Sequence, residues 1–542
     1  MKRLFTLFAI LCRVACLSAE SFNVDGFYYE SQGDEVSLTS VEDKSCTNIV
    51  VNETVTYRNK VYSVTSIGEW AFYQCNKLSG ITLPTSITAV KSNAFAECVS
   101  LSNIDIPINV RSIGAGAFRG CKRFSSIFIP KNVESVDGSA FSECDNLTQI
   151  IVDDSNSYFT SAYGNLYSKD KESLLFSPLA NSFNETAFDG IKRIGAYAFE
   201  GHTEITSLEI PSNIDFIGEF AFSGCKNLSE VSFADAEAEI EMDAKLFDGC
   251  PISKLYFGRN RKYTPRLYFD NRPFSGIETI NEVKFGDKVK EIIYNEFKDC
   301  SNLSTIVWGS SIEIINTGAF SGCTSLRSIN LPENLSRIEM GAFYESGIIA
   351  VTLPASVTYL GGNSFAKCKS LSKVILNDAI SKIEDDTFAY DSNLVEIDLG
   401  KSITFIGTLA FYGCNKLKSI RFPKSLTQFG RKVFCGCGSL ETIIAESDSP
   451  FNFIEDVFDY ATYDNATLYV PTNSLAAYYA SYYWNKFKNI VEGMPAGIEG
   501  IYSNRDLQES DSYNILGQKS YMQTNGVYVV KRNGGYRKYM KK

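Results

Sequence analysis

Cysteine thiolates can act as nucleophiles, bind zinc or form disulfides, and this chain has fifteen cysteines. Eleven of them share one setting, three residues after a phenylalanine: Cys75, Cys98, Cys121, Cys144, Cys225, Cys250, Cys300, Cys323, Cys368, Cys414 and Cys437. Side chains at one repeated position point the same way, whereas a disulfide needs Cβ atoms about 3.8 Å apart and inclined toward each other. We therefore predict a ladder of small, buried free thiols.

The single histidine, His202, takes the position of a ladder cysteine. Only His202 could supply the base of a Ser-His-Asp or Cys-His mechanism, and no C-x-x-C pair is present to bind zinc. Carboxylates such as Asp105, Glu209 and Asp398 fall at variable positions, where a solvated surface is the simpler interpretation. Residues 153–156, Asp-Asp-Ser-Asn, lack the spacing of a known calcium loop. We expect no catalytic, cofactor-binding or metal-binding residues, and no enzyme activity.

A repeat must position these side chains. Residues 67–84 read I-G-E-W-A-F-Y-Q-C-N-K-L-S-G-I-T-L-P, and the pattern recurs with most steps 23 residues long. Its marker residues are Phe72, Phe95, Phe118, Phe141, Phe199, Phe222, Phe247, Phe274, Phe297, Phe320, Phe343, Phe365, Phe388, Phe411, Phe434 and Phe458. One such unit cannot bury its own hydrophobic face, so the units must stack. At the end of each unit, alternation as in Ile81-Thr82-Leu83 indicates a short strand with Thr82 facing outward.

The repeated pattern resembles the BspA-like class of leucine-rich repeats, found in bacterial surface proteins, over about residues 64–470. The resemblance implies a β-rich leucine-rich-repeat solenoid, a right-handed curved superhelix of coils of about 23 residues. It also implies secretion or display on the cell surface, with roles in adhesion to host proteins or to other cells.

Two stretches depart from the period. An insertion at about residues 153–188 contains Tyr163–Asp170, which predicts a β-hairpin bulging from the stack. The second is basic and includes Arg259, Arg261, Lys262 and Arg266. This basic cluster is either a solvated loop or a basic contact site.

The N-terminus has the order of a secretory signal peptide: basic Lys2-Arg3, the apolar stretch 4–11, and small residues up to Ala19. We predict a signal peptide over residues 1–19 and cleavage after Ala19. A lipid anchor on Cys16 is the alternative. The exported protein would then be secreted or held at the cell surface.

Caps are expected at both ends of the solenoid, because the terminal coils would otherwise expose apolar surface. Residues 20–66 alternate as strands and predict a β cap, followed by the solenoid over 67–470. Residues 471–493 predict a helical cap, with Ser474 at the helix N-cap.

The last segment, 494–542, is expected to be a linker and a small basic β tail with a hairpin turn at Asn533-Gly534. This tail resembles a shortened bacterial secretion sorting domain. A separate small β module without an export role is the alternative.

Charge and hydropathy narrow the function classes. A net charge of −11 argues against nucleic-acid binding, and no later stretch approaches the ~20 apolar residues of a membrane span. Two classes remain. The chain is either an adhesion protein that binds a protein or a glycan of a host or neighbouring cell, or a structural surface-layer or spacer protein without a specific ligand. We expect a monomer.

The binding face is predicted at the strands, through the side chain between the two inward residues of each strand, here called the face row. The candidate binding residues are Phe128, Ile151, Tyr256, Lys284, Val307, Asn330, Asp398 and Arg421, and the row also includes Thr82, Asp105, Glu209, Ser232, Thr352, Ile375 and Ile444. Outward positions are free of core constraints, and exposed apolar side chains often mark contacts. The alternatives are that the insertion covers these residues, or that strand propensity alone selects them.

Overall fold

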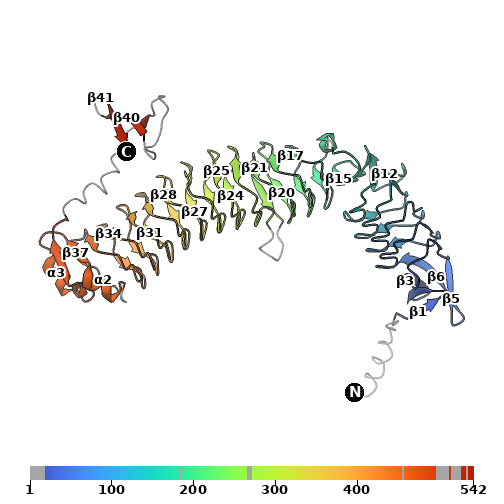
Figure 1. Ribbon diagram of the computed structural model, residues 1–542, viewed down its shortest axis with the longest axis horizontal. Coiled ribbons are helices and arrows are strands. Elements are labelled where there is room, and N and C mark those ends of the chain that lie inside the picture. Colours follow the sequence, from blue (N-terminus) through green and yellow to red (C-terminus); the bar gives the residue numbers. More distant parts are fainter. Residues whose placement is uncertain are drawn as a thin grey trace, which may run out of the picture. The chain divides into compact units, whose positions relative to one another are not determined.

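A computed structural model describes residues 19–183, 185–264, 272–453 and 457–495, and within the C-terminal tail residues 512–513, 526–532 and 535–541. The chain divides into unit 1, residues 1–326 and 332–335, and unit 2, residues 327–331 and 336–542. Its described part winds into about 18 turns with almost no helix (Figure 1). The predicted β-solenoid is therefore confirmed. Residues 1–18 of the predicted signal peptide, including Cys16, lie outside the described residues, and the signal peptide stays a prediction.

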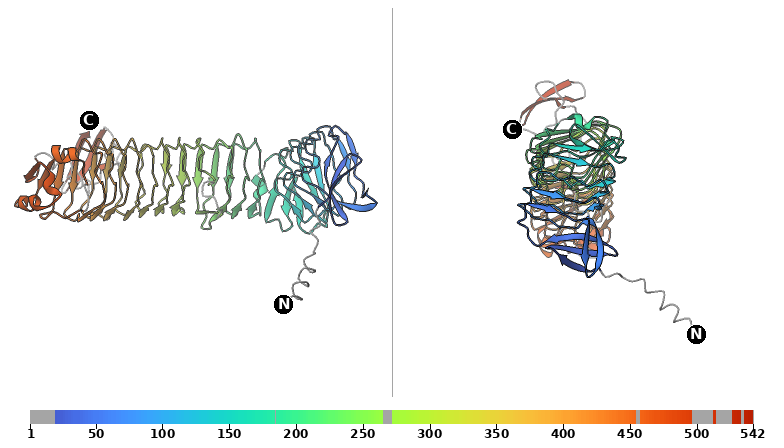
Figure 2. Two further views of the ribbon diagram at one scale, coloured as in Figure 1. Left: turned by 90° about the horizontal axis from the view of Figure 1, so that it is seen from below. Right: turned by 90° about the vertical axis from the view of Figure 1, so that its right-hand side faces the viewer.

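Each regular coil of unit 1 places two short strands on different sides of the core, and successive coils pair in parallel (Figure 2). The first strands are β7 (Gly80–Thr82), β10 (Ser126–Ile129), β12 (Gln149–Val152), β17 (Ser207–Ile210), β19 (Glu230–Phe233), β21 (Lys254–Phe257), β23 (Glu282–Phe285) and β25 (Thr305–Val307). The second strands are β8 (Ala89–Val90), β9 (Ser112–Ile113), β11 (Ser135–Val136), β16 (Arg193–Ile194), β18 (Phe216–Ile217), β20 (Ile240–Met242), β22 (Arg261–Tyr263), β24 (Glu291–Ile292) and β26 (Ile314–Ile315).

Strands also occupy the N-terminal segment before the first coil. They are β1 (Ser21–Val24), β2 (Phe27–Gln32), β3 (Glu35–Val41), β4 (Asn48–Val50), β5 (Thr54–Tyr57) and β6 (Lys60–Ile67). The β1–β2–β3 meander is antiparallel, β3 pairs in parallel with β6, and β6 pairs with β8 of the first coil. The meander therefore extends the second-strand sheet over the end of the core.

The insertion contains the predicted hairpin but does not bulge from the stack. Strands β13 (Phe159–Ala162), β14 (Asn165–Ser168) and β15 (Ser173–Phe176) form an antiparallel meander, followed by the 3-10 helix η1 (Glu185–Phe188). Strand β15 then pairs in parallel with β16, and Leu166, Leu174 and Phe176 are buried. The hairpin was predicted correctly, but the expectation that it bulges from the stack was wrong, because these alternating apolar side chains make the insertion part of the core.

The phenylalanine markers form the core of both units. All sixteen are buried, and consecutive rings stack within each regular run of coils, as in Phe72 and Phe95 with centroids 5.0 Å apart and Phe411 and Phe434 at 5.2 Å. Between Phe141 and Phe199 the insertion intervenes, and Phe176 packs edge-on against Phe141. Offset stacking adds to the free energy gained from burying each ring. The period read from the sequence is thereby confirmed as the stacking period.

Unit 2 repeats the same coil. Its first strands are β28 (Ala350–Thr352), β30 (Lys373–Ile375), β32 (Glu396–Asp398), β34 (Ser419–Phe422), β36 (Thr442–Ala445), β37 (Thr467–Val470) and β38 (Asn489–Glu492). Its second strands are β27 (Arg337–Ile338), β29 (Tyr359–Leu360), β31 (Lys382–Ile383), β33 (Phe405–Ile406) and β35 (Gln428–Phe429).

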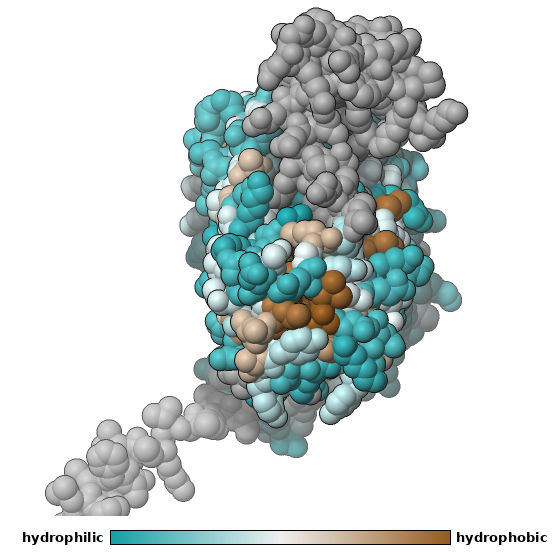
Figure 3. Space-filling model, turned by 90° about the vertical axis from the view of Figure 1, so that its left-hand side faces the viewer, coloured by the Kyte–Doolittle hydropathy of each residue, from teal (hydrophilic) through white to brown (hydrophobic). Residues whose placement is uncertain are grey.

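The last coils of unit 2 carry the short helices α2 (Tyr460–Asn465), α3 (Leu475–Ala480) and η2 (Trp484–Lys486). Ser474 is the N-cap residue of α3, as predicted, but its side chain makes no capping hydrogen bond. Glu492 Oε1 instead accepts the backbone N–H of Leu475 at 3.2 Å. An apolar patch surrounded by polar residues marks this end (Figure 3), where Val491 and Met494 are exposed.

In the tail, β40 (Gly526–Arg532) pairs antiparallel with β41 (Gly535–Lys541), and β39 (Ser512–Tyr513) pairs with β40. The partners Arg532 and Gly535 leave two residues for the connection, as the predicted Asn533-Gly534 turn requires. The turn residues themselves lie outside the described part of the chain.

Candidate functional site

The face row divides into separate groups. In unit 1, Phe128 on β10 and Ile151 on β12 are direct partners in the parallel register. Their side chains are 47 % and 42 % exposed, while the flanking Ile127 and Ile150 are buried. The neighbouring insertion therefore does not cover them. It does cover the free edge of β12, because the Ile150 N–H donates to the Gly164 carbonyl at 2.8 Å.

A second group lies on β21, β23 and β25, where Tyr256, Lys284 and Val307 are successive partners in register. Tyr256 leans across the coils: its hydroxyl donates to Asp235 Oδ1 at 2.8 Å, and the Lys284 ammonium lies 5.8 Å from its ring centroid. Burial and the hydrogen bond to Asp235 raise the pKa of Tyr256 to about 12. The group thus presents a fixed phenol, an ammonium and an exposed valine.

The remaining predicted residues belong to unit 2 and are dispersed. Asn330 is exposed and lies outside any regular strand, and Asp398 is half-buried on β32. Arg421 on β34 forms an ion pair with Glu446. Ile444, predicted to face outward, is 1 % exposed, so its assignment to the exposed row was wrong. Beyond β36 the chain continues through the helix α2 into β37, where Tyr469 is the partner of Ile444 in the parallel register.

The basic cluster is largely interior. Arg259 and Arg261 are buried, Lys262 is exposed and pairs with Glu241, and Arg266 lies outside the described residues. Arg259 donates to the Pro211 and Ser212 carbonyls, both at 3.0 Å. For Arg259 and Arg261 neither sequence interpretation was right, because their charges are used within the stack.

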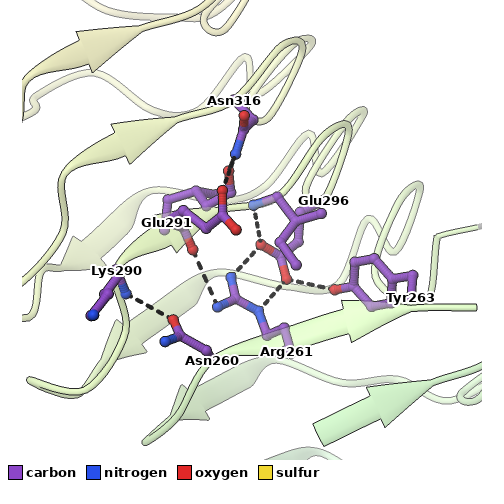
Figure 4. Close-up of polar contacts among 9 residues, drawn as sticks. Asn260, Arg261, Tyr263, Lys290, Glu291, Glu296 and Asn316 are labelled. Carbon is purple, nitrogen blue, oxygen red and sulfur yellow. Dashed lines mark hydrogen bonds and ion pairs between the residues drawn. The ribbon is translucent and has the colours of Figure 1, made fainter. Parts of the chain in front are cut away.

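Arg261 is held in what we call the splice, made of Asn260, Arg261, Tyr263 and Glu296 (Figure 4). The Arg261 guanidinium forms a bidentate ion pair with the fully buried Glu296 carboxylate, which also accepts the Tyr263 hydroxyl at 2.6 Å. Asn260 Oδ1 accepts the Lys290 N–H at 2.9 Å. No backbone pairing joins β22 to β24 in the described sheets, so these side chains bridge a break in the second-strand sheet.

The repeats seen in the structure match the model of a known protein family. The model of the BspA type leucine rich repeat region matches six copies, over residues 39–167, 192–272, 267–372 and 337–464. The chain belongs to this family.

Solved structures similar to this BspA-type repeat protein include a leucine-rich repeat protein from Bacteroides ovatus, with 22 % identity, 87 % of this chain and 100 % of the other covered, and a TM-score of 0.42. A leucine rich cell surface protein from Faecalibacterium prausnitzii has 16 % identity, coverages of 89 % and 97 %, and a TM-score of 0.26. The pneumococcal vaccine antigen PcpA has 15 % identity, coverages of 88 % and 99 %, and a TM-score of 0.26. No curated protein matches the chain.

The thiol ladder of the BspA-type coils is buried as predicted. Each thiol from the second coil of a run onward donates to the carbonyl of the marker phenylalanine one coil earlier, as Cys98 does to Phe72 at 3.1 Å and Cys437 to Phe411 at 3.2 Å. The thirteen described cysteines are free. Burial raises the pKa of Cys98, Cys144 and Cys300 to about 12, which suppresses the thiolate form.

His202 fills its ladder position as a packed side chain. It is fully buried, with Nδ1 2.6 Å from Glu204 Oε1 and Nε2 3.1 Å from the Ser177 carbonyl. Both ring nitrogens are therefore engaged below the surface, where a substrate would not reach them. Within the described ranges, no group of three His, Cys, Asp or Glu side chains is arranged to hold a metal ion.

Two groups were missed by the sequence reasoning. Glu296 occupies the position before the marker phenylalanine that most coils fill with alanine, and Asp391 occupies the ladder position of a cysteine. Both residues are acidic and buried, at positions where most coils have a small side chain. A register-by-register comparison of the coils would have shown both substitutions.

Over the described residues, no helix has the length and apolar character needed to span a membrane.

Proposed function

We propose that this BspA-type repeat protein is a secreted or cell-surface adhesion protein that binds a protein on a host or neighbouring cell through the strand-lined face of unit 1. Secretion by the predicted signal peptide is part of this proposal, as is the absence of enzyme activity. The observation that carries it is the exposed pair Phe128 and Ile151 on β10 and β12.

An exposed phenylalanine beside an exposed isoleucine is costly to leave in water, and interface anchors are commonly aromatic. A spacer without a ligand would be expected to keep a polar face row. The contrast between the exposed apolar pair and its polar neighbours Ser126 and Gln149 therefore favours binding over a purely structural role.

The test is adhesion of the purified chain to immobilised extracellular-matrix proteins and to bacterial cells, compared with the double variant Phe128→Ala/Ile151→Ala. Removing anchor side chains costs at least ~2 kcal/mol of binding free energy, so we expect about a thirtyfold weaker interaction. Thermal stability should stay nearly unchanged, since both side chains are exposed.

The matched control is Thr352→Ala on β28, an exposed residue at the same row position in unit 2. It should bind like the unaltered chain. Full binding by the Phe128→Ala/Ile151→Ala variant would rule out this face, and absence of binding to every protein and cell tested would favour the spacer. The second group is tested in the same way with Tyr256→Ala.

A further inference from the structure

Four consecutive coils of unit 1 carry unusual residues at the turn position two residues before the marker phenylalanine. These residues, here called the turn ridge, are Tyr197, Phe220, Lys245 and Arg272. The rings of Tyr197 and Phe220 stack with centroids 5.2 Å apart, and the Lys245 ammonium lies 5.7 Å from the Phe220 centroid. The ridge thus runs along the stack from two aromatic rings to two cations.

The two rings stand at a turn position whose backbone is left-handed. Tyr197 and Phe220 have φ values of 59° and 57°, in the left-handed region. Other coils place Asn93, Asn295 or Gly318 at this position, the residue types that this conformation favours. Trp70 and Leu409 hold the same position in other coils with φ values of 61° and 58°, so the backbone positions the two rings at the turn without marking them as functional.

The cations border a hollow of about 430 Å³ that both Lys245 and Arg272 line. Neither forms an ion pair with any described residue. The Arg272 guanidinium is held against the Tyr263 ring, 4.8 Å from its centroid, and its buried Nε has no hydrogen-bond partner. Two cations that line one hollow and form no ion pair within the described part of the chain are suited to bind an anion.

Two carboxylates, Asp248 and Glu278, also line the hollow, and both are exposed. They would repel a simple polyanion but can accept hydrogen bonds from hydroxyl groups. Aromatic side chains, cations and hydroxyl acceptors together match one ligand chemistry, a sugar that carries an acidic group. Coils repeat about every 4.8 Å, a length close to one pyranose ring, so successive sugars could follow successive coils.

We propose that the turn ridge binds an acidic oligosaccharide, with sugar rings against Tyr197 and Phe220 and an acidic group at Lys245 and Arg272. This site is separate from the strand-lined face and does not depend on the protein-binding function proposed above. Failure of one proposal therefore leaves the other standing.

The experiment is calorimetric titration of the full chain with oligogalacturonate and with a heparin hexasaccharide, which supply carboxylate and sulfate groups. Binding of either supports the site, and it should weaken as salt is added. Lys245→Asn/Arg272→Asn should weaken binding about tenfold or more, and Tyr197→Asn/Phe220→Asn about fivefold. Asparagine suits the positive φ of Tyr197, Phe220 and Lys245, so replacement at these three positions should leave the chain folded.

The control variant is Lys432→Asn, because Lys432 has the same coil position in unit 2 with φ 50° and lacks the aromatic neighbours. It should bind like the unaltered chain. Maltohexaose, a neutral sugar, and polyglutamate, an anion without sugars, should bind far more weakly. Equal affinity for polyglutamate, loss of binding in Lys432→Asn, or no binding of either acidic oligosaccharide would overturn the proposal.

Discussion

At the scale of single residues, the ladder position shows how the stack accommodates substitutions. Asp391 replaces a cysteine there and is fully buried; its Oδ1 accepts the Cys368 N–H at 2.8 Å, and its Oδ2 has no hydrogen-bond partner. Burial raises the pKa of the Asp391 carboxyl well above its usual range, although the Cys368 hydrogen bond opposes this shift. A carboxyl in this setting is most stable when protonated.

The raised pKa of Asp391 predicts that this residue lowers the free energy of unfolding as the pH rises. The folded chain binds this proton more tightly than the unfolded chain, whose pKa is about 3.9, so the contribution to stability falls as the pH rises above that value. Asp391→Asn mimics the protonated acid. It should change the free energy of unfolding little near pH 4 and increase it near pH 8 by more than the roughly 0.5 kcal/mol of an ordinary surface substitution.

Urea unfolding at both pH values measures this difference. Asp105→Asn, at an exposed carboxylate, is the control and should show no such change between the two pH values. If Asp391→Asn changed the free energy of unfolding by the same amount at pH 4 and pH 8, the raised pKa of Asp391 would be contradicted. Destabilisation by this variant at pH 8 would contradict it as well.

Removing a single marker phenylalanine should cause a large loss of folding stability. Phe320 is fully buried and stacks on Phe297 with centroids 5.5 Å apart. Phe320→Ala removes a ring whose neighbours can only partly collapse, so it should cost about 3–5 kcal/mol. Thermal melting followed by circular dichroism measures the loss, with Phe128→Ala as the exposed control. Equal melting of both variants would mean that the stacking period is wrong.

At the scale of structural elements, the splice replaces backbone pairing where β22 and β24 are not joined. Glu296→Ala would leave the Arg261 guanidinium buried without its counter-ion, and breaking such a pair costs about 3–5 kcal/mol. The double variant Arg261→Met/Glu296→Leu removes both charges and should recover most of the stability. Urea unfolding midpoints of the single and double variants check this, and equal loss in both would show that packing, not charge, dominates.

At the scale of the whole molecule, the thiol ladder reports on global unfolding. The ladder cysteines are buried, so in the folded chain a thiol reagent should reach them only slowly at pH 8. In denaturant without reductant, the thirteen described cysteines should all titrate. Few free groups in the unfolded, unreduced chain would mean that disulfides form in place of the ladder.

The repeat, the core and the thiol ladder could be read from the sequence. A solenoid makes this possible because each coil contacts its neighbours in one fixed register, so a side chain at a repeated position meets the same position in the next coil. Phe72 and Phe95, 23 residues apart, stack for this reason, and Cys98 reaches the Phe72 carbonyl for the same reason.

Only the tertiary structure decided what happens where the register changes. The Arg261 and Glu296 side chains meet across 35 residues where the second-strand sheet is broken. The irregular marker spacing from Phe247 to Phe274 indicates an unusual coil there, but it does not indicate which side chains meet. Likewise, Phe128 and Ile151 lie together while Ile444, at the same row position, is buried. Exposure at an outward position depends on what neighbouring segments cover, and that is a property of the folded stack and not of the repeat.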